Sequence, residues 1–302
     1  MIASGEVGLP GAVRSARSRQ PLGPRVPGQP FKSIHMATPT QPDPSPIAGQ
    51  VLLYQTPEPL DPVRHANLGM IASDRPYAFA HKQHFVPVQV AEFAQVAINY
   101  PIVFAGEDYA PIAIMGLQGG ENLFIAADGA FRVGAYAPSF IRRYPFVGAR
   151  DDSAQRMVIC IDRSFALWTE TNPTVKLFEN GQPTDFTKSC IDFCQQFDQD
   201  RAVTDAFCKL LRELDILETK QTSFTPRLAD GSAGEPQLIA EYYAVSEEKL
   251  KLLSPEKVTE LAFNGALSAI YAHLISLNCW DRIILESAAR QTPGATALNA
   301  KA

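Results

Sequence analysis

The chain has 302 residues, of which 46% are hydrophobic and 20% are charged, a composition typical of a globular protein that can bury a sizeable core. The net charge is −5, and it becomes −9 over residues 36–302, because the first 35 residues hold five cations and one anion. An acidic body argues against nucleic acid or anionic lipid as the main partner, and no run of about 18 apolar residues predicts a transmembrane helix.

Residues 1–49 are rich in Pro, Gly, Ser and Arg and lack hydrophobic periodicity, so we expect them to be disordered. They fit a transit peptide or an over-extended reading frame that truly starts at Met36, and we favour the second. They lack the apolar core of a secretory signal, and the five cysteines lie in apolar surroundings typical of reduced thiols. We therefore expect a cytoplasmic protein with one domain over residues 50–288 and a flexible tail over residues 289–302.

The first half of the domain shows one short helical pattern followed by strands. Apolar positions within residues 88–97 predict an amphipathic helix that ends at Tyr100-Pro101. Short connections, with turn signals at Gly119-Gly120 and Asp128-Gly129, indicate an antiparallel meander rather than βαβ units. The predicted strands cover residues 102–104, 112–117, 123–125 and 157–161.

The second half is mainly helical. Apolar periodicity over residues 186–214 predicts one helix or two, and Ser254-Pro255 has the residues that favour a helix start. A strongly apolar helix is predicted over residues 267–277. Further strands are predicted over residues 176–178, 221–224 and 238–245. The fold class we predict is α+β, with an antiparallel or mixed sheet from the N-terminal half packed against helices mainly from the C-terminal half.

The candidate binding residues cluster around an arginine pair. Arg142 and Arg143 lie among aromatic residues, where a guanidinium can hold a carboxylate or phosphate group. The alternative, which we favour, is that the arginines pack on those aromatic rings or pair with local acids. Asp162 follows a buried strand and, like Glu121, could supply a polar partner. The candidate ligand-binding set is Arg142, Arg143, Tyr144, Asp162 and Glu121.

Other motifs do not predict a metal or a cofactor. Cys190 and Cys194 lie one helical turn apart but have no second ligand pair, so we interpret them as core cysteines. His81 and His84 could share a metal with Glu92, although loop or surface histidines are the favoured interpretation. Residues 116–121 contain three glycines but lack the Lys-Ser/Thr ending of a phosphate loop. His273 is expected to be a core histidine.

Five segments of the chain, taken in order, resemble the SapC family of bacterial proteins. The resemblance covers residues 51–286, and its strongest block is residues 136–146. The other matching segments are residues 100–104, 120–124, 160–162 and 270–274. The family takes its name from a gene in a surface-layer protein cluster, so the resemblance implies a link to surface-layer or envelope processes. It brings no catalytic residues to carry over.

Three functional hypotheses follow. The first is a non-catalytic accessory or binding protein linked to surface-layer or envelope-associated processes. The second is an enzyme or an enzyme partner that acts on peptides or amino-acid-derived small molecules, with an Arg-aromatic site for the carboxylate. The third is a structural protein that forms oligomers without a ligand. The sequence contains no Gly-x-Ser-x-Gly or His-Glu-x-x-His motif that would indicate a reaction.

Overall fold

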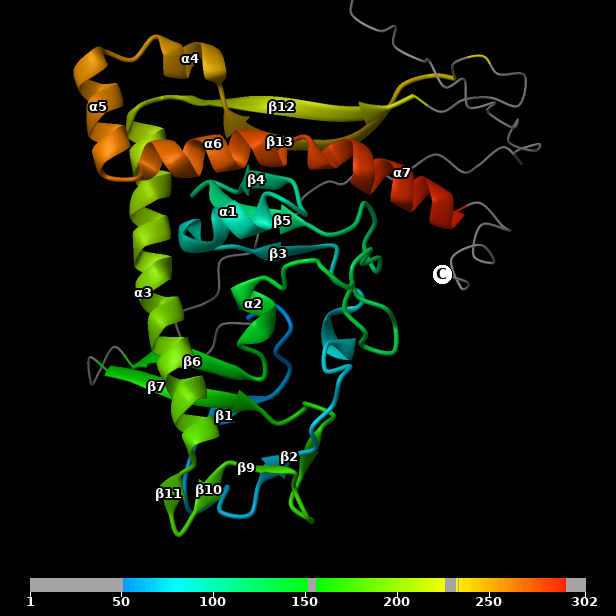
Figure 1. Ribbon diagram of the computed structural model, residues 1–302, viewed down its shortest axis with the longest axis vertical. Coiled ribbons are helices and arrows are strands. Elements are labelled where there is room, and N and C mark those ends of the chain that lie inside the picture. Colours follow the sequence, from blue (N-terminus) through cyan, green and yellow to red (C-terminus); the bar gives the residue numbers. More distant parts are fainter. Residues whose placement is uncertain (1–50, 152–155, 226–231, 233, 292–302) are drawn as a thin grey trace, which may run out of the picture.

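The computed structural model describes residues 51–151, 156–225, 232 and 234–291. The molecule is elongated, with one long helix, α3 (Asp185–Glu213), running along its side (Figure 1). A five-stranded sheet with its covering helices lies at one end of α3, and three smaller sheets lie towards the other end. The α+β class predicted from the sequence is confirmed.

The five-stranded sheet combines strands from both halves of the chain. Its order is β12-β13-β4-β5-β3, and every neighbouring pair is antiparallel. The sheet therefore depends on a late hairpin as well as on the N-terminal strands, since Tyr243 of β13 pairs with Phe104 of β4. The strands are β3 (Phe85–Pro87), β4 (Ile102–Ala105), β5 (Ala110–Ile114), β12 (Leu217–Phe224) and β13 (Gln237–Val245).

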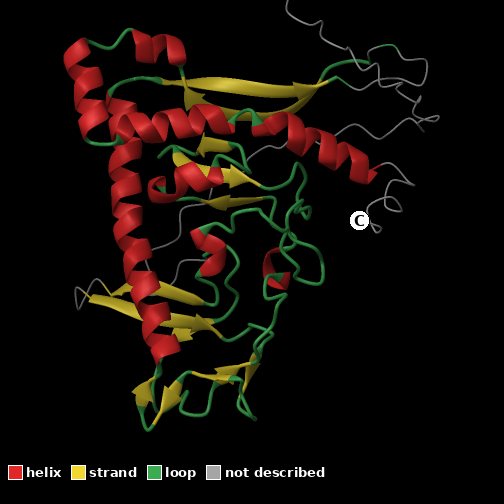
Figure 2. Ribbon diagram, in the orientation of Figure 1, coloured by secondary structure: helices red, strands yellow, loops and turns green. Residues whose placement is uncertain are grey.

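Helices pack against this sheet: α6 runs across one of its faces, and α7 continues from α6 past the ends of β4 and β5 (Figure 2). Ser254 caps α5 as predicted, because its hydroxyl accepts the Lys257 N–H and Pro255 occupies the first turn. His273 of α6 is fully buried, as predicted. The helices are α1 (Phe93–Val96), α4 (Glu247–Lys251), α5 (Pro255–Phe263), α6 (Ala266–Ser276) and α7 (Cys279–Gln291).

The long helix α3 connects the two ends of the molecule. The apolar pattern over residues 186–214, which predicted one helix or two, forms one continuous helix. Thr184 caps this helix, because its hydroxyl oxygen accepts the Thr187 N–H. The first half of α3 buries Cys194 against Phe146 and Ile161, which belong to the smaller sheets. The second half buries Phe207 and Leu211 against the five-stranded sheet. Because α3 contacts both regions, its middle turns face the junction between them (Figure 1).

The region at the other end is built from short strands and one helical turn, α2 (Ser139–Arg142). One of its two three-stranded sheets has the order β1-β7-β6, and the strand predicted over residues 157–161 forms the centre of that sheet. The strands here are β1 (Pro57–Pro59), β2 (Gly69–Met70), β6 (Phe146–Asp151), β7 (Arg156–Asp162), β8 (Trp168–Thr169), β9 (Val175–Lys176), β10 (Phe178–Glu179) and β11 (Gln182–Pro183). Two 3₁₀ helices are η1 (Ala78–Ala80) and η2 (Val90–Glu92).

The strand predicted over residues 123–125 is wrong. Leu123 and Phe124 form a bend, and Ile125 makes only an isolated bridge to Phe131. The buried side chain of Asn122 accounts for the difference, because its Oδ1 accepts the N–H groups of Phe124 and Ile125 at 2.8 and 3.0 Å. An Asn that bonds to the following backbone offers an alternative to a strand ladder.

The ends of the chain lie largely outside the described residues. The leader expected over residues 1–49 is not among them, and α7 continues through Gln291, into the expected tail. Within the described segments, none of the helices is both long and apolar enough to cross a membrane. The 29-residue helix α3 is the longest of them, but charged residues recur along it.

Candidate ligand-binding site

The strongest candidate site is a cavity of about 200 Å³ at the junction between the two ends of the molecule. Three elements supply its walls: η2 with the residue before it, α2 with the segment that leads into it, and the middle of α3. The lining residues are Gln89, Ala91 and Glu92 from the first, Tyr136, Ser139 and Arg142 from the second, and Phe193, Gln196, Phe197 and Asp200 from the third.

Arg142 is the cation of this cavity. Its guanidinium carbon lies 5.4 Å from the centre of the Tyr136 ring and 5.2 Å from the centre of the Phe193 ring. Its Nε donates to the Ala137 carbonyl at 2.9 Å, and one terminal nitrogen donates to the Tyr136 hydroxyl at 2.9 Å. The other terminal nitrogen has no hydrogen bond or ion pair among the described residues. Arg142 is therefore fixed in position with donors to spare.

Glu92 is a buried acid that links the cavity walls by hydrogen bonds. The residue is only 5% exposed, and its carboxylate accepts four hydrogen bonds. Oε1 accepts from the Gln89 N–H at 3.0 Å and from the Ser139 hydroxyl at 2.7 Å. Oε2 accepts from the Ser139 N–H at 2.8 Å and from the Tyr136 hydroxyl at 2.9 Å. A buried carboxylate with this many donors is satisfied, so Glu92 links η2 to α2 and orients Tyr136 below Arg142.

Two further groups add polarity to the cavity. Burial and the nearby Glu92 carboxylate raise the pKa of Tyr136, so its hydroxyl keeps the proton that it donates to Glu92. Gln89 is 6% exposed, and its side chain faces the backbone N–H of Glu92. The Gln89 Oε1 atom nevertheless has no hydrogen-bond partner among the described residues. A buried amide oxygen without a partner is uncommon in a native structure and marks a place where a hydrogen-bond donor of a ligand could complete the bonding.

Arg143 has a different environment from its neighbour. Its guanidinium carbon lies 4.1 Å from the Phe197 ring centre, 4.7 Å from that of Phe140 and 5.7 Å from that of Tyr54. Burial among these rings lowers the pKa of Arg143. No carboxylate of the described residues lies within 4.0 Å of its nitrogens. These contacts match the packing interpretation that we favoured for the arginine pair.

Asp162 and Tyr144 lie in one hydrogen-bonded cluster that holds neighbouring loop segments together. Asp162 is fully buried and accepts hydrogen bonds from the backbone N–H groups and hydroxyls of Thr56 and Ser164, and from the Gln55 N–H. The Tyr144 hydroxyl donates to it at 3.3 Å, and the Tyr144 ring stacks on Phe79. Burial alone would raise the pKa of Asp162, but its hydrogen bonds hold it below the usual value.

Glu121 is separate from the other candidate residues. Its Oε2 accepts from the Leu117 N–H at 3.3 Å and from the Ser287 hydroxyl at 2.8 Å, which ties the loop to α7. Within the described residues, no hydrogen bond or ion pair joins Glu121 to Arg142 or Asp162. The structure thus brings together Tyr144 and Asp162, places Arg142 at a cavity with Glu92, and leaves Glu121 elsewhere.

The residues considered for a metal site are used in other ways. Glu92 bonds to Ser139 and Tyr136, while His81 Nδ1 lies 2.5 Å from the Ala78 carbonyl oxygen. Cys194 is buried and Cys190 is half-buried, and burial raises the pKa of the Cys190 thiol to about 12. The described part of the chain has no cluster of three His, Cys, Asp or Glu residues that could hold a metal ion.

The block of residues 136–146, which includes Tyr136, Ser139 and Arg142, is the densest part of the resemblance, so a comparison with known families bears directly on the cavity. The SapC family model matches residues 60–283. The chain belongs to the SapC family. No curated protein and no solved structure matches it. The SapC match includes every residue that lines the cavity.

Sequence reasoning on this SapC-family chain found Arg142 but missed most of its partners. Glu92 was considered only as a metal ligand, and Asp200 was not considered at all. A usable signal was present at Gln89 and Glu92, whose spacing is that of a capping box at a helix start. A second signal was the spacing of Phe193, Gln196 and Asp200, which places them on one face of α3.

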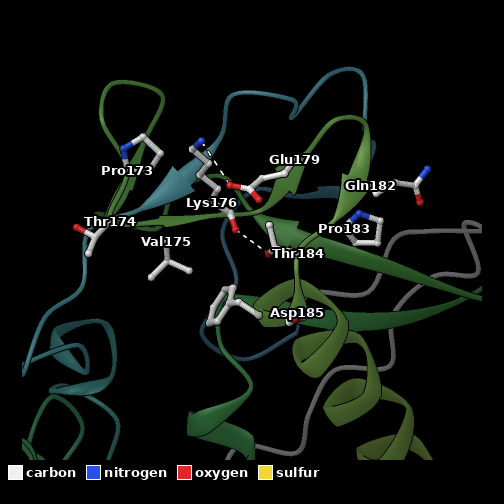
Figure 3. Close-up of a pocket in the computed structure, with 10 residues that line it drawn as sticks. Pro173, Thr174, Val175, Lys176, Glu179, Gln182, Pro183, Thr184 and Asp185 are labelled. Carbon is white, nitrogen blue, oxygen red and sulfur yellow. Dashed lines mark hydrogen bonds and ion pairs between the residues drawn. The ribbon is translucent and has the colours of Figure 1, made fainter.

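A larger hollow of about 520 Å³ lies beside the β10–β11 hairpin and the start of α3 (Figure 3). Two of its charged groups pair with each other, since Lys176 Nζ lies 3.5 Å from Glu179 Oε1, and both side chains are more than half exposed. Thr184 donates its hydroxyl proton to the Lys176 carbonyl. Each residue that lines this hollow is at least partly exposed, so it offers no desolvated polar group to anchor a ligand.

Proposed function

We propose that this SapC-family protein binds small carboxylate-bearing molecules at Arg142 and carries out no reaction of its own. One observation carries the proposal: Arg142 is held between two aromatic rings at a cavity, and one of its terminal nitrogens has no partner among the described residues. A guanidinium fixed in this way presents its planar fork to a carboxylate at little cost in side-chain entropy.

The non-catalytic part of the proposal is supported by Glu92. The oxygens of its carboxylate accept four hydrogen bonds, from Gln89, Tyr136 and Ser139. A general base needs a lone pair that can reach a substrate proton, and these bonds occupy the Glu92 oxygens. We therefore assign Glu92 a positioning role. The surface-layer or envelope setting is part of the proposal, and its support is the resemblance to a family that is named after a gene in a surface-layer protein cluster.

An enzyme, or an enzyme partner, that acts on peptides or amino-acid-derived molecules would use the same Arg142 anchor. The two proposals differ in what happens to the bound molecule. A binding protein returns its ligand unchanged after long incubation, whereas an enzyme, or its partner complex, converts it. Proton NMR spectra of the recovered ligand distinguish these outcomes.

Calorimetric titration tests the binding proposal. The probes are 4-methylpentanoate and its uncharged counterpart 4-methylpentanamide, and the proteins are the wild type, Arg142→Gln and Arg132→Gln. Arg132 is a matched control, because it is exposed and also lies over an aromatic ring, that of Phe124. We expect the acid to bind to the wild type and to Arg132→Gln, and the amide and Arg142→Gln to show at least tenfold weaker binding. Equal binding of the acid by Arg142→Gln would refute the proposal.

A further inference from the structure

Asp200 lies on the α3 wall of the Arg142 cavity and has no cationic partner among the residues that the structure describes. Its Oδ1 accepts a hydrogen bond from Gln196 Nε2 at 2.9 Å, which fixes the carboxylate. Neighbouring acids on the same helix do form ion pairs, since Asp198 and Asp205 both contact Arg201. Asp200 therefore has unused capacity for a positive group, and this capacity faces a cavity.

Arg142 and Asp200 lie at different heights along one face of α3, because Arg142 of α2 packs over Phe193 and Asp200 is itself part of α3. Phe193, Gln196, Phe197 and Asp200 follow the spacing that places side chains on one side of a helix. The Arg142 guanidinium lies over Phe193, and Asp200 is seven residues further on, which is about 10 Å along the helix axis. The cavity thus has a positive end and a negative end, with the Phe197 ring and the Gln196 amide between them.

We propose that the ligand of this cavity is a zwitterion of the free amino-acid type, whose carboxylate is held by Arg142 and whose ammonium group is held by Asp200. The inference rests on the proposed carboxylate binding and adds the second charge. Charge-assisted hydrogen bonds of about 2.8 Å at each end, plus the short span between the two charges of an amino acid, bridge a separation of this order. Such a ligand gives Arg142 and Asp200 each a partner of opposite charge, so neither residue loses its water on binding without gaining an ion pair.

The size and the remaining polarity of the cavity fit such a ligand. A volume of about 200 Å³ corresponds to roughly seven water molecules at about 30 Å³ each, which suits a small amino acid. The half-buried Phe193 ring and the buried Phe197 ring offer an apolar surface to a side chain. The Gln89 Oε1 atom, which has no hydrogen-bond partner among the described residues, can accept from the ammonium group.

Three matched pairs of probes test this inference on the full chain by calorimetry. They are glycine with acetate, L-alanine with propanoate, and L-leucine with 4-methylpentanoate. We expect at least one amino acid to bind to the wild type about tenfold more tightly than its partner without the amine. Asp200→Asn should make the two members of that pair equal while it still binds the simple acid. Asp205→Asn, a change of the same kind on the same helix, should keep the preference.

The outcomes separate this inference from the function on which it rests. Equal affinities within all three pairs in the wild type would overturn the zwitterion and leave carboxylate binding intact, and this comparison needs no folded variant. A preference that survives in Asp200→Asn would overturn the role of Asp200. No binding of any of the six compounds would overturn both proposals.

Discussion

Ser139 donates two hydrogen bonds to one carboxylate, that of Glu92: its N–H reaches Oε2 at 2.8 Å and its hydroxyl reaches Oε1 at 2.7 Å. The contact joins the first residue of α2 to the last residue of η2, which are 47 positions apart in the chain. The same carboxylate orients Tyr136, and Tyr136 contacts Arg142. The position of the cation therefore depends on a buried acid that does not touch it.

Glu92→Gln should destabilise the protein by about 2–3 kcal/mol, because one carboxylate oxygen is replaced by an NH₂ group that faces donors in a buried site. Urea unfolding followed by circular dichroism measures the change. Glu247→Gln is the control, since Glu247 is 61% exposed and forms a surface ion pair with Lys251, and we expect less than about 0.5 kcal/mol there. Equal effects from the two substitutions would contradict the role assigned to Glu92.

Arg142 and Arg143 should respond in opposite ways to substitution by Lys. Arg142→Lys should weaken carboxylate binding about tenfold with little change in stability, because the planar fork is lost at an exposed site. Arg143→Lys should leave binding within about twofold but cost about 1–2 kcal/mol of stability, because the guanidinium packs among Tyr54, Phe140 and Phe197. Calorimetry and urea unfolding on the same preparations compare the two. A loss of binding in Arg143→Lys together with a loss of stability in Arg142→Lys would contradict the roles assigned to the two arginines.

Asp162→Asn should reduce the free energy of unfolding at pH 7 by about 2–3 kcal/mol, because the buried carboxylate accepts bonds from Gln55, Thr56 and Ser164. Its native pKa is below the unfolded value of 3.8, so its contribution to stability is complete above 3.8 and is lost as the pH falls from there through the lower native pKa. The variant should therefore lose less stability than the wild type when urea unfolding is repeated from pH 5 to pH 3. A parallel loss in both proteins would contradict this assignment.

His273 should make the protein less stable as the pH falls from about 6.5 to about 4. Burial lowers its pKa to about 4, and the neutral ring bonds on both sides: Nδ1 donates to the Ile102 carbonyl, and Nε2 accepts from the Val245 N–H. The unfolded chain takes up a proton near pH 6.5 while the native ring stays neutral, so protonation favours unfolding, by about 3 kcal/mol in total.

The measurement is urea unfolding at intervals between pH 7.5 and 4.5, with His273→Gln as the comparison. The Gln variant starts from a lower stability, because the bond to Ile102 or to Val245 is altered, but it should lack the extra slope. The half-buried His81 serves as the control, and His81→Gln should keep the wild-type slope. The same slope in wild type and His273→Gln would show that other groups cause the pH dependence.

The sequence predicted local structure well wherever the pattern was governed by neighbours in the chain. The strands β4 and β7 and the helix start at Ser254 are examples, because apolar runs and capping residues act over a few positions. The strand expected over residues 123–125 failed because the Asn122 side chain takes up two of the backbone N–H groups there. Hydrophobicity gives no sign of that competition.

The site was predicted only in part, because its contacts are long-range. The sequence identified Arg142 by its aromatic neighbourhood, yet Phe193, one of the two rings that it contacts, comes from α3. Glu92 reaches Ser139 across 47 positions, and no local pattern specifies such a pairing. The two arginines are adjacent in sequence and chemically identical, so only the structure shows that Arg143 packs in the interior while Arg142 faces a cavity.

The most direct test of the central claim is the NMR signal of the Arg142 Nε–H group during titration of the wild type with 4-methylpentanoate. The signal is assigned by its absence from Arg142→Lys. We predict a saturable shift of this signal, with the signals of Arg143 and Arg132 unmoved. A titration in which the Arg142 signal does not shift, or in which all exposed arginines shift equally and without saturation, would contradict the claim that Arg142 anchors a carboxylate ligand.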